Sequence, residues 1–181
     1  LNTEIEFSAD MLENIVDEEI EKRIFKENVK INKNNMTLFT DEATYIPSLN
    51  QVILNNNVKM YDGIDSLKCN NLILYDKTDK EFIAKGNVNF YRSNQYIQCE
   101  NLEYKESLEN KTLTLYLYDE AQLIDSSRVI IGDTLNIHYQ DSIIDNMYVL
   151  SNAKFINYRL AKYDKELKSR KIEDNMTGKK M

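Results

Sequence analysis

The sequence contains few residues of the kinds that usually bind metals or act as nucleophiles. It has two cysteines, Cys69 and Cys99, and a single histidine, His138. A zinc site needs about four ligands at close spacing, and a disulfide framework needs several cysteines. His138 lies in an alternating stretch beside Tyr139 and is interpreted as an ordinary surface or half-buried side chain. We therefore expect no metal and no cofactor.

Closely spaced aspartates are the remaining candidates for catalysis. They form three pairs, Asp62 with Asp65, Asp76 with Asp79, and Asp141 with Asp145. A glycosidase needs two carboxyl groups in one cleft, but these pairs fall in predicted turns, where aspartate is a common turn former. The turn interpretation is favoured, and the chain is expected not to be an enzyme.

A recurring pattern indicates which elements must position these residues. The stretch "AKGNVNFY" (84–91) is an alternating strand pattern interrupted by Gly-Asn, and related stretches occur at 25–32, 54–61, 118–125 and 150–157. Their anchor residues follow one another at intervals of about 30 residues; they are Asn28, Asn57, Asn87, Glu120 and Asn152. Such a period predicts supersecondary units that bury their apolar faces only by stacking on one another.

Within each unit the apolar residues alternate with polar ones, as at Leu113, Leu115 and Leu117. A period of two residues is typical of strands. The segment 8–28 is rich in Glu and Ile and could pass for a helix, but its agreement with the repeat favours strand, turn, strand. Polar stretches at 76–81, 105–111 and 140–146 are interpreted as hairpin turns. The predicted fold class is all-β, with stacked antiparallel strands from about five repeats of ~30 residues.

The Gly-Asn interruption is interpreted as a bend in the strand. Gly86 aligns with Glu27, Asn56, Asp119 and Ser151 in the other units, and never with a large apolar residue. A polar or glycine position between apolar pairs on one face indicates a bulge or corner, because Gly and Asn tolerate unusual dihedrals. The stacked neighbours Asn28, Asn57, Asn87 and Asn152 are expected to form an amide ladder.

Bends in register would fold the strands into a V or flattened roll with an apolar trough inside. The residues predicted to line this trough are Leu54, Val58, Met60, Phe82, Val88, Phe90, Leu115, Leu117, Leu123, Val149 and Phe155. The trough is either a closed, dry core or a groove, open along one side, that accepts long acyl chains. The sequence leaves both interpretations open.

Composition and charge exclude some classes of partner. The net charge is −7, so nucleic acid and anionic membrane surfaces would be repelled. The basic clusters at 165–171 and 178–180 are interpreted as a solvated tail or loop. No window of about 18 apolar residues is present, and Leu1 does not begin a recognisable signal peptide.

Several stretches together resemble the OstA/LptA family. They are "SADMLEN…RIFKENVKI", "CNNLILYDKTDKEFIAKGNVNFY" and "QCENLEYKESLENKTLTLYLYDEAQLID", which are similar to that family's A-D-x-L-x-Y-D…A-x-G-N-V repeats. The resemblance covers essentially the whole chain. It departs from the pattern at Glu120-Ala121, which stand in place of Asn-Val, and in the absence of glycine from four of the five anchors.

The resemblance implies an open, twisted β-jellyroll, also called a β-taco, and a function. It implies a non-enzymatic periplasmic protein that binds lipopolysaccharide or lipid A among the trough residues. It also implies edge-strand addition to LptC-like and LptD-like components, and end-to-end self-association, in a bridge to the outer membrane. The alternative is a structural or adhesive β-repeat protein without a lipid ligand. Anionic lipid A phosphates would find little attraction in a chain of charge −7.

Two further expectations concern the limits of the domain and the cysteines. Residues 1–163 are predicted to be one OstA-like domain, and residues 164–181 a polar segment that is a tail or the start of a further repeat. Cys69 and Cys99 occupy equivalent sites in successive units, either as small buried residues or as a disulfide.

Overall fold

The structure is a computed structural model that describes residues 5–16, 20–76, 79–159 and 171–177, with the backbone alone at 158–159 and 171–177. These residues form strands and one short 3-10 helix, η1 (Pro47–Leu49). The strands are β1 (Glu6–Ser8), β2 (Met11–Val16), β3 (Glu21–Lys33), β4 (Met36–Ile46), β5 (Gln51–Asp62), β6 (Asp65–Tyr75), β7 (Lys80–Arg92), β8 (Gln95–Ser107), β9 (Thr112–Ile124), β10 (Arg128–Gln140), β11 (Ile143–Leu150), β12 (Lys154–Arg159) and β13 (Lys171–Thr177).

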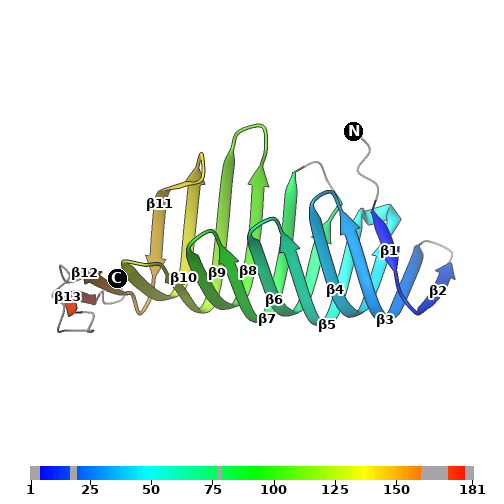
Figure 1. Ribbon diagram of the computed structural model, residues 1–181, viewed down its shortest axis with the longest axis horizontal. Helices are drawn as coiled ribbons and strands as arrows, with labels where there is room; N and C mark the ends of the chain where they lie inside the picture. The colour runs from blue at the N-terminus through cyan, green and yellow to red at the C-terminus, as the bar shows by residue number, and fades with distance from the viewer. Residues whose placement is uncertain (1–4, 17–19, 77–78, 160–170, 178–181) are drawn as a thin grey trace, which may run out of the picture.

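All the strands belong to one antiparallel sheet in which each of β3 to β10 pairs with its neighbours in the chain. At one end β1 and β2 pair with the two halves of β3, and at the other β11 and β12 pair with the two halves of β10. Strand β13 extends the sheet from β12. Figure 1 shows the resulting row of long hairpins. The predicted all-β class of stacked antiparallel strands in an open β-jellyroll is confirmed, as is strand rather than helix over 11–16 and 21–28.

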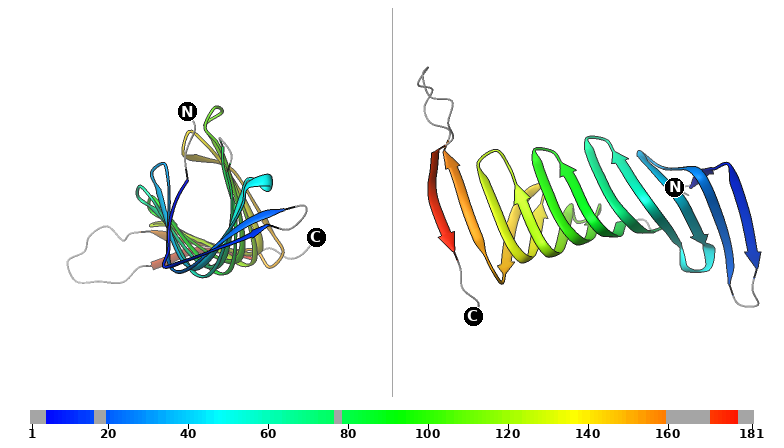
Figure 2. Two further views of the ribbon diagram at one scale, coloured as in Figure 1. Left: turned by 90° about the vertical axis from the view of Figure 1, so that its right-hand side faces the viewer. Right: turned by 90° about the horizontal axis from the view of Figure 1, so that it is seen from below.

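Each long strand turns a corner near its middle, so the sheet has two walls that rise from a curved base (Figure 2, left). We call the half that includes the starts of β3, β5, β7 and β9 wall A, and the half that includes their ends wall B. The hairpin turns form the rim of each wall, lip A and lip B, and the gap between the lips is the mouth. No backbone ladder joins the two lips in the described part of the chain.

The corners coincide with five pairs of residues in the left-handed region of backbone conformation. They are Glu27-Asn28, Asn56-Asn57, Gly86-Asn87, Asp119-Glu120 and Ser151-Asn152, with φ between 49° and 76°. Where both flanking halves pair with the same neighbour, the register shifts at this level, for example between Lys85 and Val88 in β7. Two successive left-handed residues therefore act as a bulge that redirects the strand.

Aspartates on neighbouring segments of the chain bond three of these corners. The side-chain amides of Asn28, Asn57 and Asn152 donate to Asp10, Asp41 and Asp133 at 2.7, 2.7 and 2.9 Å. The prediction of an amide ladder is therefore wrong, because these asparagines bond to aspartates and not to one another. Asn28, Asn57 and Asn87 lie on the alternate strands β3, β5 and β7, about 9.5 Å apart at the usual strand spacing, which is too far for them to bond one another. Asn152 lies between β11 and β12.

The space between the walls is filled by one continuous apolar core. It includes Leu38, Leu54, Leu72, Leu102 and Ile137, each fully buried. Ring stacking contributes at two places, between Phe82 and Tyr104 with centroids 4.5 Å apart, and between Phe7 and Phe25 at 4.4 Å. Burial of this alternating face is the main force that holds the folded sheet together.

Gly86 should be the corner residue least tolerant of substitution. A Cβ added there would lie 2.6 Å from Asn70 Nδ2, in addition to the cost of its φ of +76°. Gly63 is a matched control, because its φ is +60° but its added Cβ would meet nothing within 4 Å. We expect Gly86→Ala to lower the free energy of unfolding by about 2 to 3 kcal/mol, and Gly63→Ala by about 1 kcal/mol. Urea denaturation measures both, and equal losses would contradict a role for the Asn70 contact.

The predicted boundary between residues 163 and 164 lies outside the described residues. Beyond it, β13 pairs antiparallel with β12 from Lys154↔Thr177 to Arg159↔Lys171. The basic cluster at 165–171 lies outside the described residues except for Lys171, and the cluster at 178–180 lies wholly outside them.

Candidate functional site: the apolar interior and its mouth

The residues proposed from sequence to line the trough all lie on the inner face of the sheet. Nine of them have at most 1% of their surface exposed, namely Leu54, Val58, Met60, Phe82, Val88, Phe90, Leu115, Leu117 and Leu123. Val149 on β11 and Phe155 on β12 are partly buried and pack against the others. The interior is therefore filled by its own side chains between the walls, and a ligand would have to displace or separate them.

The interior extends to β2 at one end of the sheet and to β11 and β12 at the other. At one end Leu12 on β2 stands opposite Phe25, on the inner face, and is 57% exposed. At the other end Met147, Val149 and Phe155 are only half-buried against the core. The apolar surface thus continues beyond the closed middle at both ends.

An ion pair crosses the mouth above the first half of the core. Lys33 lies at the end of β3 on lip B, and Asp76 follows β6 on lip A. Lys33 Nζ lies 2.8 Å from Asp76 Oδ1, and only 7% of the lysine side chain is exposed. Since Lys33 pairs in the sheet with Met36 and not with Asp76, the contact joins one wall to the other across the mouth.

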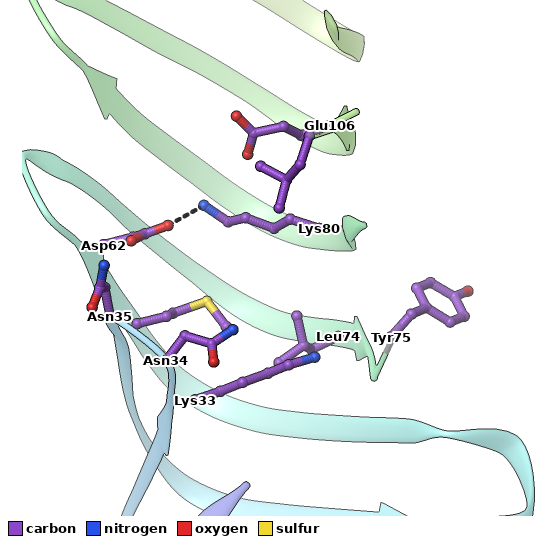
Figure 3. Close-up of a pocket in the computed structure, with 10 residues that line it drawn as sticks. Lys33, Asn34, Asn35, Asp62, Leu74, Tyr75, Lys80 and Glu106 are labelled. Atoms are coloured by element: carbon purple, nitrogen blue, oxygen red, sulfur yellow. Dashed lines mark hydrogen bonds and ion pairs between the residues drawn. The ribbon is translucent and has the colours of Figure 1, made fainter. Parts of the chain in front are cut away.

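A second ion pair crosses the mouth beside the first. Lys80, at the start of β7 on lip A, contacts Asp62, at the end of β5 on lip B. Figure 3 shows this pair spanning the gap between two strand ends. The Lys80 ammonium also lies 4.9 Å from the centroid of the Tyr104 ring, where a cation is attracted to the aromatic face.

Two polar contacts continue the bridging towards β10. Arg92 on lip B donates to the Tyr104 hydroxyl at 3.4 Å, and the Tyr139 hydroxyl on β10 donates to Gln95 Oε1 at 2.7 Å. Arg92 is also paired with Asp65 on its own lip at 2.7 Å. Burial raises the pKa of Tyr139 to about 12, so its hydroxyl remains a donor at neutral pH.

We call these four cross-mouth contacts the seam: Lys33–Asp76, Lys80–Asp62, Arg92–Tyr104 and Tyr139–Gln95. The sheet is open in its backbone pairing, yet its mouth is closed by side chains. Opening the mouth to solvent or to a ligand requires these contacts to break.

Sequence reasoning missed the seam, although its residues follow a pattern. After each of the first four corners two inward apolar residues are followed, at the next inward position, by a charged one. The four are Lys33, Asp62 and Arg92, which belong to the seam, and Asp125, which pairs with Arg128 on its own lip. A charged residue that continues an inward alternation at a strand end was the available signal, because only at the mouth can such a side chain reach both water and the opposite lip.

The aspartates considered for catalysis have structural partners. Asp62 and Asp76 belong to the seam, Asp65 pairs with Arg92, and Asp79 Oδ1 accepts from the backbone amide of Leu108 at 3.4 Å. No group of three or more His, Cys, Asp or Glu gathers in metal-binding geometry within the described residues. His138 lies half-buried on the outer face, with Nδ1 3.0 Å from Thr114 Oγ1.

Both cysteines are free and buried in the core. They lie on β6 and β8, on either side of β7, so about two strand spacings separate them. A disulfide needs closer Cα atoms, which excludes that alternative. Desolvation raises the pKa of each thiol to about 12.

These raised thiol pKa values predict a loss of stability at alkaline pH. Between pH 9 and 12 the unfolded chain releases thiol protons that the folded chain retains, so the free energy of unfolding falls as pH rises. We expect Cys69→Ala with Cys99→Ala to lose less stability than the native chain between about pH 8 and pH 10.5. Urea denaturation of both proteins at the two pH values measures this difference in stability. The buried tyrosines are present in both proteins, so their titration does not contribute to the difference. Parallel losses would contradict the assigned cause.

Within the described residues, no helix has the length and apolar character needed to cross a membrane. Fold and site together define an all-β, open jellyroll scaffold with a continuous apolar interior.

In sequence, the chain matches no protein-family profile and no curated protein. Among solved structures it is similar to LptH from Pseudomonas aeruginosa, described as the LptA-homologous periplasmic component of the conserved lipopolysaccharide transport device. The identity is 13%, with 82% of this chain and 83% of that chain covered, and the TM-score is 0.32. At that TM-score the two folds agree too loosely for the likeness to support an assignment.

Proposed function

We propose that this chain is a non-enzymatic, periplasmic protein that binds lipopolysaccharide and shields its acyl chains during transport towards the outer membrane. The observation that carries the proposal is the apolar interior, which runs the length of the sheet beneath a mouth closed only by side chains. The repeats that resemble the OstA/LptA family supply the identity of the lipid and the compartment.

Acyl chains would lie among the inward residues on either side of the corners. Val88 and Phe90 line wall B, and Phe82, Leu115 and Leu117 line wall A. Each methylene buried there gains about 0.8 kcal/mol, so several acyl chains could be held without any covalent step. Separation of the walls at the mouth would make room for them.

The ends of the sheet are the proposed contacts with other jellyroll components, LptC-like at one end and LptD-like at the other, or with a second copy. The outer edge of β2 has no strand partner in the described chain, and its four large apolar side chains are exposed, namely Met11, Leu12, Ile15 and Val16. Strand addition would satisfy this backbone edge. It would also continue the interior past Leu12.

A structural or adhesive β-repeat protein without a ligand is the second candidate. The observation in its favour is the filled interior, where the core residues leave no empty groove along the middle of the sheet. The two candidates differ in whether the walls separate in the presence of lipid.

Native mass spectrometry of the purified chain with lipopolysaccharide tests the proposal. We expect a 1:1 complex that survives dilution, and weaker binding of a de-acylated derivative, because the acyl chains supply the apolar surface. Absence of any complex, or equal binding of the de-acylated derivative, would favour the ligand-free candidate.

A further inference from the structure

We propose that the cavity at the mouth lined by Lys33 and Lys80 binds a phosphate group on the head of the lipid, which displaces Asp76 and Asp62 from the two lysines. This inference rests on the proposed function and adds to it the chemistry that recognises the headgroup.

The cavity lies where the seam begins and has a volume of about 270 Å³. Its walls combine charged and polar side chains from both lips with apolar ones that belong to the edge of the core. The lining residues include Lys33, Lys80, Asn34, Asn35, Met36 and Leu74. Figure 3 shows the Lys33 and Lys80 side chains on different strands that border this pocket, with the Lys80 ammonium directed at Asp62 and the Lys33 ammonium beside Leu74. A headgroup seated there would have its acyl chains directed at the adjoining core.

The donors in the cavity suit a phosphate better than a carboxylate. Each ammonium offers three N–H donors, and each of the two lysines is paired with one carboxylate in the closed state. A phosphate monoester carries a charge of about −1.5 to −2 and three strong acceptor oxygens, so it has acceptors enough for both ammonium groups once they leave their carboxylates and turn towards it. The side-chain amides of Asn34 and Asn35 line the same cavity and can add neutral donors.

The carboxylates that would be displaced are better placed to enter water than the lysines are. The Asp76 and Asp62 side chains are 21% and 28% exposed, against 7% for Lys33 and 16% for Lys80. Glu106 also lines the cavity, but it accepts a hydrogen bond from the Tyr104 hydroxyl at 2.7 Å. The exchange would leave the buried cations paired and release the more exposed anions to solvent.

A lysine at these positions is hard to explain by stability alone. Lys33 follows Val29 and Ile31 on the inward face of β3, where an apolar residue would pack without a desolvation cost. Buried ion pairs often stabilise a fold no better than apolar residues of the same volume. A buried ion pair does, however, provide a charged side chain that can exchange its carboxylate partner for another anion. The cavity thus gathers two cations, beside the carboxylates of Asp62 and Glu106, in a chain whose net charge is −7.

Partner exchange would also act on the mouth itself. Each lysine bonds to a carboxylate on the opposite lip. Transfer of both lysines to the headgroup therefore removes two of the four seam contacts, directly above the core. Headgroup recognition and opening of the interior would be one event.

The test compares two lipids on three proteins. The probes are purified lipid A with its phosphates and the same lipid after phosphatase treatment. The proteins are the native chain, Lys33→Gln with Lys80→Gln, and Lys59→Gln with Lys68→Gln, whose lysines are exposed on the outer face of wall B. We expect the cavity variant to bind the phosphorylated lipid at least about 10-fold more weakly. The treated lipid should bind the cavity variant at least as well as the native chain, because the variant lacks two of the contacts that close the mouth.

A second variant and a second probe separate the remaining explanations. Lys33→Arg with Lys80→Arg keeps both charges and should retain the preference for phosphorylated lipid, which a general folding defect would not allow. Inorganic phosphate should compete only weakly, because the acyl chains supply most of the affinity.

If the two lipids bind the cavity variant and the native chain equally well, the headgroup inference is overturned while the proposed function stands. If neither lipid binds the native chain, the proposed function itself fails. Full competition by inorganic phosphate at micromolar concentration would indicate a site for the free ion and would also overturn the inference.

Discussion

Covalent linkage of the two lips should abolish lipopolysaccharide binding. The change is Lys80→Cys with Asp62→Cys, joined by a short bis-maleimide that spans the gap now bridged by the ion pair. Because the interior is filled when the mouth is closed, acyl chains can enter only if the walls separate, and a covalent bridge prevents that separation. Binding measured by native mass spectrometry should fall to background after crosslinking. Before crosslinking the double variant should still bind.

A matched control uses two positions that do not face each other across the mouth. Lys59 and Lys68 stand directly opposite each other on the outer face of wall B. Cysteines there can be joined by the same reagent without restraining the lips. The native cysteines should not interfere, because both are buried. Undiminished binding by the chain crosslinked across the mouth would show that lipid does not enter the interior by this route.

Truncation of Phe82 should be the most damaging single change to the fold. Its ring is fully buried and stacks on Tyr104 with centroids 4.5 Å apart. We expect Phe82→Ala to lower the free energy of unfolding by about 3 to 5 kcal/mol, through lost burial and the cavity that remains. Urea denaturation followed by circular dichroism measures the change.

Phe39→Ala is the control for that measurement. Phe39 lies on the outer face of β4 and is 39% exposed. Its ring meets the Tyr61 ring edge-on, with the two centroids 6.2 Å apart. Its truncation should cost no more than about 1 kcal/mol. Similar losses for the two variants would mean that the interior is not the main source of stability.

The fold could be predicted from the sequence because each repeat shows the same local pattern of residues. Alternation with a period of two residues predicted strands, and a polar or glycine pair that interrupts the apolar face once in each repeat predicted a change of direction. All five of those pairs, such as Gly86-Asn87, are left-handed in the structure. Backbone conformation of this kind depends on neighbours in the chain, and so it is visible in sequence.

The seam could not be predicted in the same way, because its contacts join residues that no sheet register brings together. Lys33 meets Asp76, and Gln95 meets Tyr139, only after the corners have set the angle between the walls. That angle depends on how side chains such as Phe82 and Tyr104 fill the interior. The choice between a filled core and an empty groove depended on the same packing and stayed open for the same reason.

Photocrosslinking to lipopolysaccharide at adjacent positions of β7 tests the central claim most directly. Val88 and Phe90 point into the interior and are at most 1% exposed, whereas Asn89 between them points outward. With a photoreactive residue at each position in turn, the account predicts lipid adducts at 88 and 90 and none at 89. Adducts at 89 alone, or at none of the three in a chain that binds lipopolysaccharide, would contradict it.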